Sequence, residues 1–255
     1  MKTMLLVAAA AVFAVAVTVS ARAARAQEAA RAQDAGAKPV TCVPKQKNPE
    51  RHEQFMKDKA EALKKGPIQL VFIGDSITDA WRQPQYNGIY TERWGKYNPL
   101  NIGISGDKTE HVLWRLENGE LDDLAGGAKL AVIMIGTNNL GNKPQASPED
   151  TAEGVKCVVA KVREKLPEAK VLLLAVFPRG KEASNPFRAQ LKTLNDRIAK
   201  LDDGKQVKYL DISDAFLDDD GTLPADVMPD QLHPNLKGYQ IWADAVGPTI
   251  EEMMK

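Results

Sequence analysis

Three stretches of this chain have an uninterrupted apolar run, and each run leads directly into glycine or proline and polar residues. They are "IQLVFIG" at 68–74, "KLAVIMIG" at 129–136 and "KVLLLAVFP" at 170–178. A strand with apolar side chains on both of its faces is buried on both faces, as is typical of a parallel sheet. Because helical stretches alternate with these strands, the chain predicts an α/β fold with a mostly parallel sheet.

Two further strands are expected within 97–106 and 207–213, which makes a five-stranded sheet. Helices are predicted from their periodicity and from their start and stop signals. The predicted helices cover 48–66, 147–166, 185–201 and 233–255. Asn48 is expected to cap the first of them, and Gly247–Pro248 is a candidate kink in the last.

Glycine and polar residues follow four of the predicted strands where each strand ends. In open α/β sheets, ligands bind beyond the carboxyl ends of the strands. These segments are therefore expected to share one rim, which makes them the candidate site. They are Gly74–Ser76, Gly103–Asp107, Gly136–Asn139 and Pro178–Gly180.

Ser76 has two interpretations. In "SITD", Asp79 stands three residues after Ser76, which is close to a capping box and favours a helix cap. A serine at a helix N-terminus is equally well placed for nucleophilic attack, because backbone N–H groups there stabilise a developing oxyanion. The serine alone does not decide between them.

A serine nucleophile needs a base, and the chain has three histidines. His52 lies in a charged helix without a catalytic neighbour, and His111 lies on an amphipathic stretch. His233 follows Asp230 by three residues, so the carboxylate can reach one ring nitrogen while the other faces out. Acid, imidazole and serine are the parts of a catalytic triad. The alternative is an aspartate in a turn beside an exposed histidine.

The same rim offers donors for an oxyanion. Ser76 and Gly106 each have a backbone N–H, and Asn138 has its side-chain amide. The alternative for "GTNN" is a simple turn, because Gly and Asn both tolerate positive φ. Several such motifs in order, each at a strand end or before the closing helix, favour catalysis.

These motifs make the chain resemble the SGNH (GDSL-type) hydrolases over residues 68–250. The resemblance rests on "GDSIT" with Ser76, "NIGISGD" with Gly106, "GTNN" with Asn138, and "DQLH" with Asp230 and His233. Within that family the chain looks most similar to the catalytic subunits of platelet-activating-factor acetylhydrolase. That similarity rests on "GISGDKTEHVLWRLENGEL", "FPRGKEASNPFR" and "LHPNLKGY".

The resemblance implies a flavodoxin-like three-layer α/β/α sandwich and ester hydrolysis without a metal or cofactor. It also implies that Leu232 lines the acyl pocket.

No His, Cys or Asp cluster has metal spacing. In "LDDDG", Phe216 and Val227 occupy positions where a calcium loop needs acidic ligands, so we interpret it as a solvated turn. Lys plus Arg equals Asp plus Glu at 34 each, so the composition does not suggest the basic face that nucleic-acid binding needs.

The N-terminus predicts a secretory signal peptide over 1–26. Lys2 precedes an apolar run, and sites of the A-x-A type end at Ala23 and Ala26. A membrane anchor is the alternative, although the run is short for a span of about 20 residues. We therefore expect a secreted or periplasmic protein without a stable membrane anchor after cleavage. A flexible leader over 27–47 and a hydrolase domain over 48–255 complete the expected organisation.

Cys42 and Cys157 are the only cysteines. In an exported protein such a pair can form a disulfide. Two unrelated buried thiols are equally compatible with the sequence, because geometry decides.

We therefore expect an exported serine esterase that removes short acyl groups, chiefly acetyl, from carbohydrates or other small esters. A lysophospholipase or thioesterase is the alternative among hydrolases. A binding module on the same scaffold is the alternative from another class. Such a module needs neither Asp230 nor Asn138, and the chain has both. The oligomeric state is not indicated.

Overall fold

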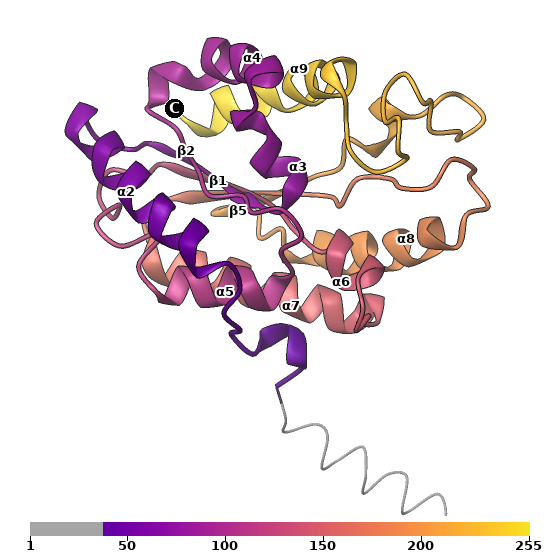
Figure 1. Cartoon of the computed structure of the whole chain (residues 1–255), viewed down its shortest axis with the longest axis horizontal. Coiled ribbons are helices and arrows are strands. Elements are labelled where there is room, and N and C mark those ends of the chain that lie inside the picture. Colours follow the sequence, from indigo (N-terminus) through magenta and orange to yellow (C-terminus); the bar gives the residue numbers. More distant parts are fainter. Residues whose placement is uncertain (1–37) are drawn as a thin grey trace, which may run out of the picture. The chain divides into compact units, whose positions relative to one another are not determined.

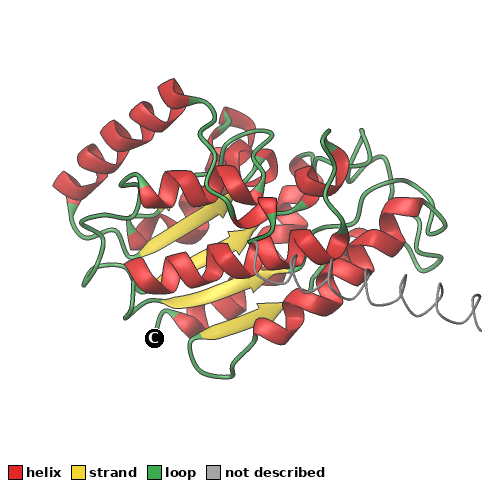
Figure 2. Cartoon of the chain, turned by 90° about the horizontal axis from the view of Figure 1, so that it is seen from below, coloured by secondary structure: helices red, strands yellow, loops and turns green. Residues whose placement is uncertain are grey.

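The sheet has five strands, and every neighbouring pair is parallel. The computed structural model describes residues 38–255. The strands are β1 (Leu70–Gly74), β2 (Leu100–Asn101), β3 (Leu130–Met134), β4 (Lys170–Leu174) and β5 (Val207–Leu210). Their spatial order is β2-β1-β3-β4-β5, and Figure 2 shows the arrows pointing the same way. This is the flavodoxin-like order, so the predicted fold class is confirmed.

Helices cover both faces of the sheet because successive strand side chains point to opposite sides. Val71 and Ile73 of β1 enter one apolar cluster, whereas Leu70 and Phe72 enter the other. In Figure 1 one set of helices lies above the sheet and a second set lies below it. The upper helices are α3 (Ser76–Asp79), α4 (Pro84–Trp94) and α9 (Leu236–Met253). The lower helices are α5 (Thr109–Glu117), α6 (Thr137–Gly141), α7 (Pro148–Lys165) and α8 (Pro186–Ile198).

The helix termini follow the sequence signals with two exceptions. Ser147 and Asn185 cap α7 and α8 through their side chains. Asn48 precedes α2 (Pro49–Lys65), but its side chain makes no capping hydrogen bond and its φ is 50°. The last helix begins at Leu236, after the predicted start, with Asn235 as its cap.

Residues 39–47 belong to the folded unit, which begins at Pro39. A short 3₁₀ helix, η1 (Val40–Cys42), packs on α7 through a disulfide between Cys42 and Cys157. The Thr41 hydroxyl donates to the Asp150 carbonyl at 2.6 Å, and the Thr109 hydroxyl donates to the Thr41 carbonyl at 2.9 Å. The expected boundary at 48 therefore lies too late, because these bonds hold the preceding segment in place.

The predicted signal peptide and the leader up to residue 37 lie outside the described residues. Across residues 38–255, no helix combines the length and the apolar character needed to cross a bilayer.

The disulfide is expected to stabilise the fold without serving catalysis. It closes a loop with a sequence separation of 115 residues. The chain-entropy model then allows roughly 4 to 5 kcal/mol, an upper figure that residual structure in the unfolded state reduces. Replacing both cysteines by serine should lower the free energy of unfolding by up to that amount, as measured by urea denaturation. An unchanged urea midpoint in the double variant would contradict this role.

Candidate active site

Ser76, His233 and Asp230 form one continuous chain of hydrogen bonds. The Ser76 Oγ lies 2.9 Å from the His233 Nε2, and the His233 Nδ1 lies 2.6 Å from the Asp230 Oδ2. The other Asp230 oxygen accepts backbone N–H bonds from Leu232 at 3.0 Å and His233 at 2.7 Å. The structure thus brings together three residues that sequence spacing had paired only in part. This arrangement can activate a serine hydroxyl through an oriented imidazole.

The helix that carries Ser76 is capped by Asp75, not by Ser76. The Asp75 Oδ1 accepts the backbone N–H of Ile77 at 3.0 Å, so the cap interpretation of Ser76 is wrong. Ser76 is the first residue of α3 and comes directly after β1. A Cβ on Gly74 would lie 2.1 Å from the Thr78 Oγ1. Glycine is therefore needed for α3 to fold back so tightly on its strand.

The turn that carries His233 is tied to the β4 loop and to α3. The Gln231 carbonyl accepts the Gly180 N–H at 2.9 Å, and the Gln231 side chain accepts the Lys181 N–H at 3.1 Å. From α9, the buried Tyr239 hydroxyl donates to the Ile77 carbonyl at 2.7 Å. These bonds fix the imidazole relative to the serine, although the two residues are far apart in sequence.

The Gly106 loop lies beside α3. Gly106 has a φ of +74°, which favours glycine. The backbone N–H of Ser105, the preceding residue, donates to the Asp79 Oδ2 at 3.1 Å. Asp79 therefore positions this loop and does not complete a capping box with Ser76. Within residues 38–255, the backbone N–H groups of Ser76 and Gly106 have no protein acceptor.

Asn138 is held in one orientation from both ends of its amide. Its Nδ2 donates to the Asp107 carbonyl at 3.0 Å, and its Oδ1 accepts from the Asn142 Nδ2 at 2.9 Å. Asn138 is buried on α6, which directly follows β3. One N–H bond of its Nδ2 is left for another acceptor. The Asn142 contact had no sequence signal beyond its i+4 spacing on the helix.

A buried ion network supports the Gly106 loop through Asp107. The Arg115 Nε donates to the Asp107 Oδ2 at 2.9 Å, and the Arg115 Nη1 pairs with Glu120. The second Glu120 oxygen lies 3.0 Å from the His52 Nδ1. The sequence did not predict this network, because its members are spread over α2, the Gly106 loop, α5 and the turn after α5.

The other two histidines have structural partners. His52 pairs with Glu120 as above, and the His111 Nδ1 accepts the Lys108 backbone N–H at 3.0 Å. The pKa of His111 is lowered to about 4, chiefly by burial; the charge of Glu110 opposes this shift and three nearby lysines contribute to it. His111 is therefore neutral near pH 7. His233 is the histidine that contacts Ser76.

The pKa values of Asp75 and Asp230 are shifted in opposite directions. Burial raises the pKa of Asp75 to about 7, helped by the charge of Asp107 and opposed by the Ile77 N–H, His233 and Arg179. Burial also acts to raise the pKa of Asp230. The hydrogen bonds from His233 and Leu232 and the imidazole charge outweigh it, so that pKa lies below its ordinary value. Asp230 is thus ionised at neutral pH and can stabilise an imidazolium.

Leu232 is half-buried on the same turn, and in sequence it lies between Asp230 and His233. Its acyl-pocket role stays a prediction.

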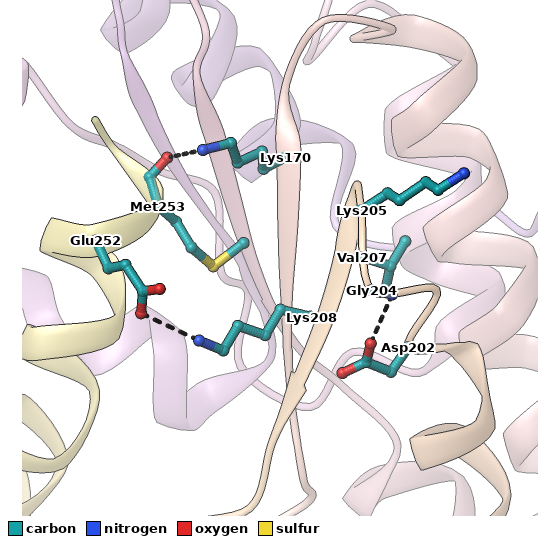
Figure 3. A pocket seen from close by; sticks show the side chains of 8 residues that line it. All are labelled: Lys170, Asp202, Gly204, Lys205, Val207, Lys208, Glu252 and Met253. Atoms are coloured by element: carbon teal, nitrogen blue, oxygen red, sulfur yellow. Dashed lines mark hydrogen bonds and ion pairs between the residues drawn. The ribbon is translucent and has the colours of Figure 1, made fainter.

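Among the described residues the rim has no arrangement for a metal, and a separate pocket lies away from it. Across residues 38–255, no group of three or more His, Cys, Asp or Glu side chains is placed to hold a metal ion. A pocket of about 350 Å³ lies at the amino ends of β4 and β5, opposite the edge that carries Ser76. Figure 3 shows the side chains that line it. Its Lys170 donates to the Met253 carbonyl and its Lys208 pairs with Glu252, so both ammonium groups already have partners within the protein.

Residues 72–241 match the model of the GDSL-like lipase/acylhydrolase family. The α1 subunit of platelet-activating factor acetylhydrolase IB from Homo sapiens is 37% identical over 189 residues, which cover 74% of this chain and 76% of the subunit. A GDSL-like lipase from Bacteroides thetaiotaomicron has a similar fold, with a TM-score of 0.61, 20% identity, and coverage of 79% and 98% of the two chains. An acetyl xylan esterase from Geobacillus stearothermophilus has a similar fold with a TM-score of 0.57 and 21% identity. The match covers 72% of this chain and 94% of the esterase.

The raised pKa of Asp75 predicts a pH-dependent stability difference from Asp75→Asn, which keeps the carbonyl acceptor for Ile77. Between about pH 4 and 7 the folded carboxyl is protonated while the unfolded one is ionised, so raising the pH favours unfolding of the wild type. Relative to the variant, the wild type should lose at most about 1.4 kcal/mol per pH unit and then level off. Urea unfolding from pH 4 to 9 measures this. Asp219→Asn, on an exposed turn, is the control, and parallel curves for wild type and Asp75→Asn would refute the assignment.

Proposed function

Because the chain belongs to the GDSL-like lipase/acylhydrolase family of carboxylic ester hydrolases, we propose that Ser76, His233 and Asp230 are its catalytic triad. The observation that carries the proposal is the unbroken contact from the Ser76 Oγ through the imidazole to Asp230, at 2.9 and 2.6 Å. The Ser76 Oγ attacks the ester carbonyl while the His233 Nε2 takes its proton. The imidazolium then protonates the leaving alcohol, and water releases the acyl group by the same cycle.

The oxyanion is bound by the backbone N–H groups of Ser76 and Gly106 and by the free N–H of Asn138. What supports this assignment is that these N–H bonds have no other acceptor among the described residues. Donors held in place before the reaction stabilise charge without reorganising when it develops.

The substrate class is a short-chain ester, chiefly an acetyl ester, of a carbohydrate or another small alcohol. Support comes from the names of two similar proteins, a platelet-activating factor acetylhydrolase subunit and an acetyl xylan esterase. Both names specify removal of acetyl groups. Activity against 4-nitrophenyl esters of increasing chain length should fall steeply beyond the shortest acyl groups.

The protein acts after export, in a secreted or periplasmic setting. The N-terminal apolar run with its A-x-A sites supports this proposal. The bond between Cys42 and Cys157 also supports it, because such bonds persist mainly in oxidising compartments.

Ser76→Ala is expected to remove nearly all hydrolysis of 4-nitrophenyl acetate. Binding and the oxyanion donors would remain, so residual activity should lie within roughly 10³–10⁴-fold of the uncatalysed rate. A serine-directed phosphonate should label the wild type at Ser76 and leave the variant unlabelled. Ser213→Ala, away from the triad, is the matched control. An active or labelled Ser76→Ala protein would remove Ser76 as the nucleophile.

Asn138→Ala and Asn139→Ala should separate catalysis from structure in two adjacent buried residues. Asn139 uses its amide within the fold, where it accepts from the Thr109 N–H at 3.0 Å and donates to Glu110 at 3.0 Å. Asn138→Ala should lower kcat by roughly 10²–10³ with little change in KM, because its donor acts mainly on charge in the transition state. Asn139→Ala should instead lower the melting temperature. Steady-state kinetics and thermal unfolding check both, and an unchanged kcat in Asn138→Ala would leave "GTNN" as a turn.

A further inference from the structure

Arg179 lies at the rim of the site, in the loop that follows β4. Its guanidinium carbon sits 4.1 Å from the centre of the Phe187 ring. Its Nη1 makes two long contacts on α6, to the Thr137 carbonyl at 3.3 Å and to the Thr137 hydroxyl at 3.4 Å. A Cβ on Gly141 would lie 2.2 Å from this Nη1, so α6 has a glycine where the guanidinium lies against it. The guanidinium is thus held between the Phe187 ring and α6.

Arg179 has no carboxylate partner, in contrast to most other arginines of residues 38–255. No carboxylate lies within 4.0 Å of Arg179, and its Nε and Nη2 have no protein acceptor. Arg188 also lacks a carboxylate, but it donates to the carbonyls of Arg179, Gly180 and Gly221. Each of the remaining arginines contacts an acidic side chain; they are Arg51, Arg82, Arg93, Arg115, Arg163 and Arg197.

The position of Arg179 relates it to both sides of the reaction centre. Thr137, which it contacts, directly precedes Asn138 of the proposed oxyanion site. Gly180, the next residue, donates to Gln231 on the turn of His233. Since His233 must protonate the leaving oxygen, we infer that Arg179, whose neighbour Gly180 is bonded to the His233 turn, faces the leaving alcohol.

Resting on the proposed esterase function, we propose that Arg179 forms a subsite for an anionic oxygen group on the alcohol part of the ester. A carboxylate and a phosphate share the chemistry that would be recognised. A planar guanidinium with free Nε and Nη2 donors binds either group through two parallel hydrogen bonds. Stacking on Phe187 holds the fork before binding, which reduces the conformational entropy lost.

Matched pairs of aryl acetates test this subsite. One pair is meta-acetoxybenzoate and its neutral partner meta-acetoxybenzamide, and the other is meta-acetoxyphenyl phosphate and meta-acetoxyphenol. Comparing the ratio of kcat/KM within each pair between wild type and variant cancels the intrinsic reactivity of each ester. Arg163→Gln, which removes an exposed arginine paired with Asp203, controls for the loss of one positive charge.

Arg179→Gln should lower kcat/KM for the anionic ester roughly 10–100-fold more than for its neutral partner, mainly through KM. Arg179→Lys keeps the charge but not the fork, so the ratio should be intermediate. A change in one pair alone identifies that anion as the ligand. If Arg179→Gln lowers kcat/KM equally for the anionic and the neutral ester of both pairs, or leaves it unchanged, the subsite is overturned. Arg179 is then only a support for Thr137.

A second measurement needs no variant. Benzoate or inorganic phosphate should inhibit wild-type hydrolysis of the neutral ester competitively, and the absence of inhibition by both would count against the subsite. Failure of the esterase proposal is distinguishable, since it would appear as neutral-ester hydrolysis that survives Ser76→Ala.

Discussion

The buried ion pair between Asp107 and Arg115 anchors the Gly106 loop, and the placement of the proposed oxyanion donors depends on this loop. Both side chains are almost completely excluded from solvent. Removing one partner of such a pair leaves an uncompensated buried charge, which typically costs 3–5 kcal/mol. Asp107 directly follows Gly106, and its carbonyl accepts the Asn138 amide. One residue therefore fixes a backbone donor and a side-chain donor of the proposed oxyanion site.

The parallel sheet supplies the rest of the placement. Because β1, β3 and β4 run in the same direction, Ser76, Asn138 and Arg179 emerge at one edge without any long connection. The His233 turn arrives from a distant part of the chain. It is locked by hydrogen bonds to the β4 loop and, through Tyr239, to α3. The fold thus positions three groups by topology and the fourth by specific polar contacts.

The sequence could predict the features that depend on local pattern. All five strands, the Ser76 and His233 segments and most long helices follow from apolar runs, caps and spacing. α4 escaped prediction because "PQYNGIYTERW" has weak amphipathic periodicity and an internal glycine. Pairings between distant residues escaped as well. Nothing local joins His52 to Glu120, and the Cys42–Cys157 bond required geometry to decide it.

The acid–base side of the site contrasts with this buried network. The side chains of Asp230 and His233 are 56% and 43% exposed, so their hydrogen bond is screened by water and contributes little to folding stability. Its effect is orientation, because two backbone N–H groups and the imidazole all bind the one carboxylate. The same exposure lets water reach the imidazole, which hydrolysis of an acyl-enzyme requires. Rigidity is therefore concentrated where charge must be stabilised, and solvent access where protons and water must be exchanged.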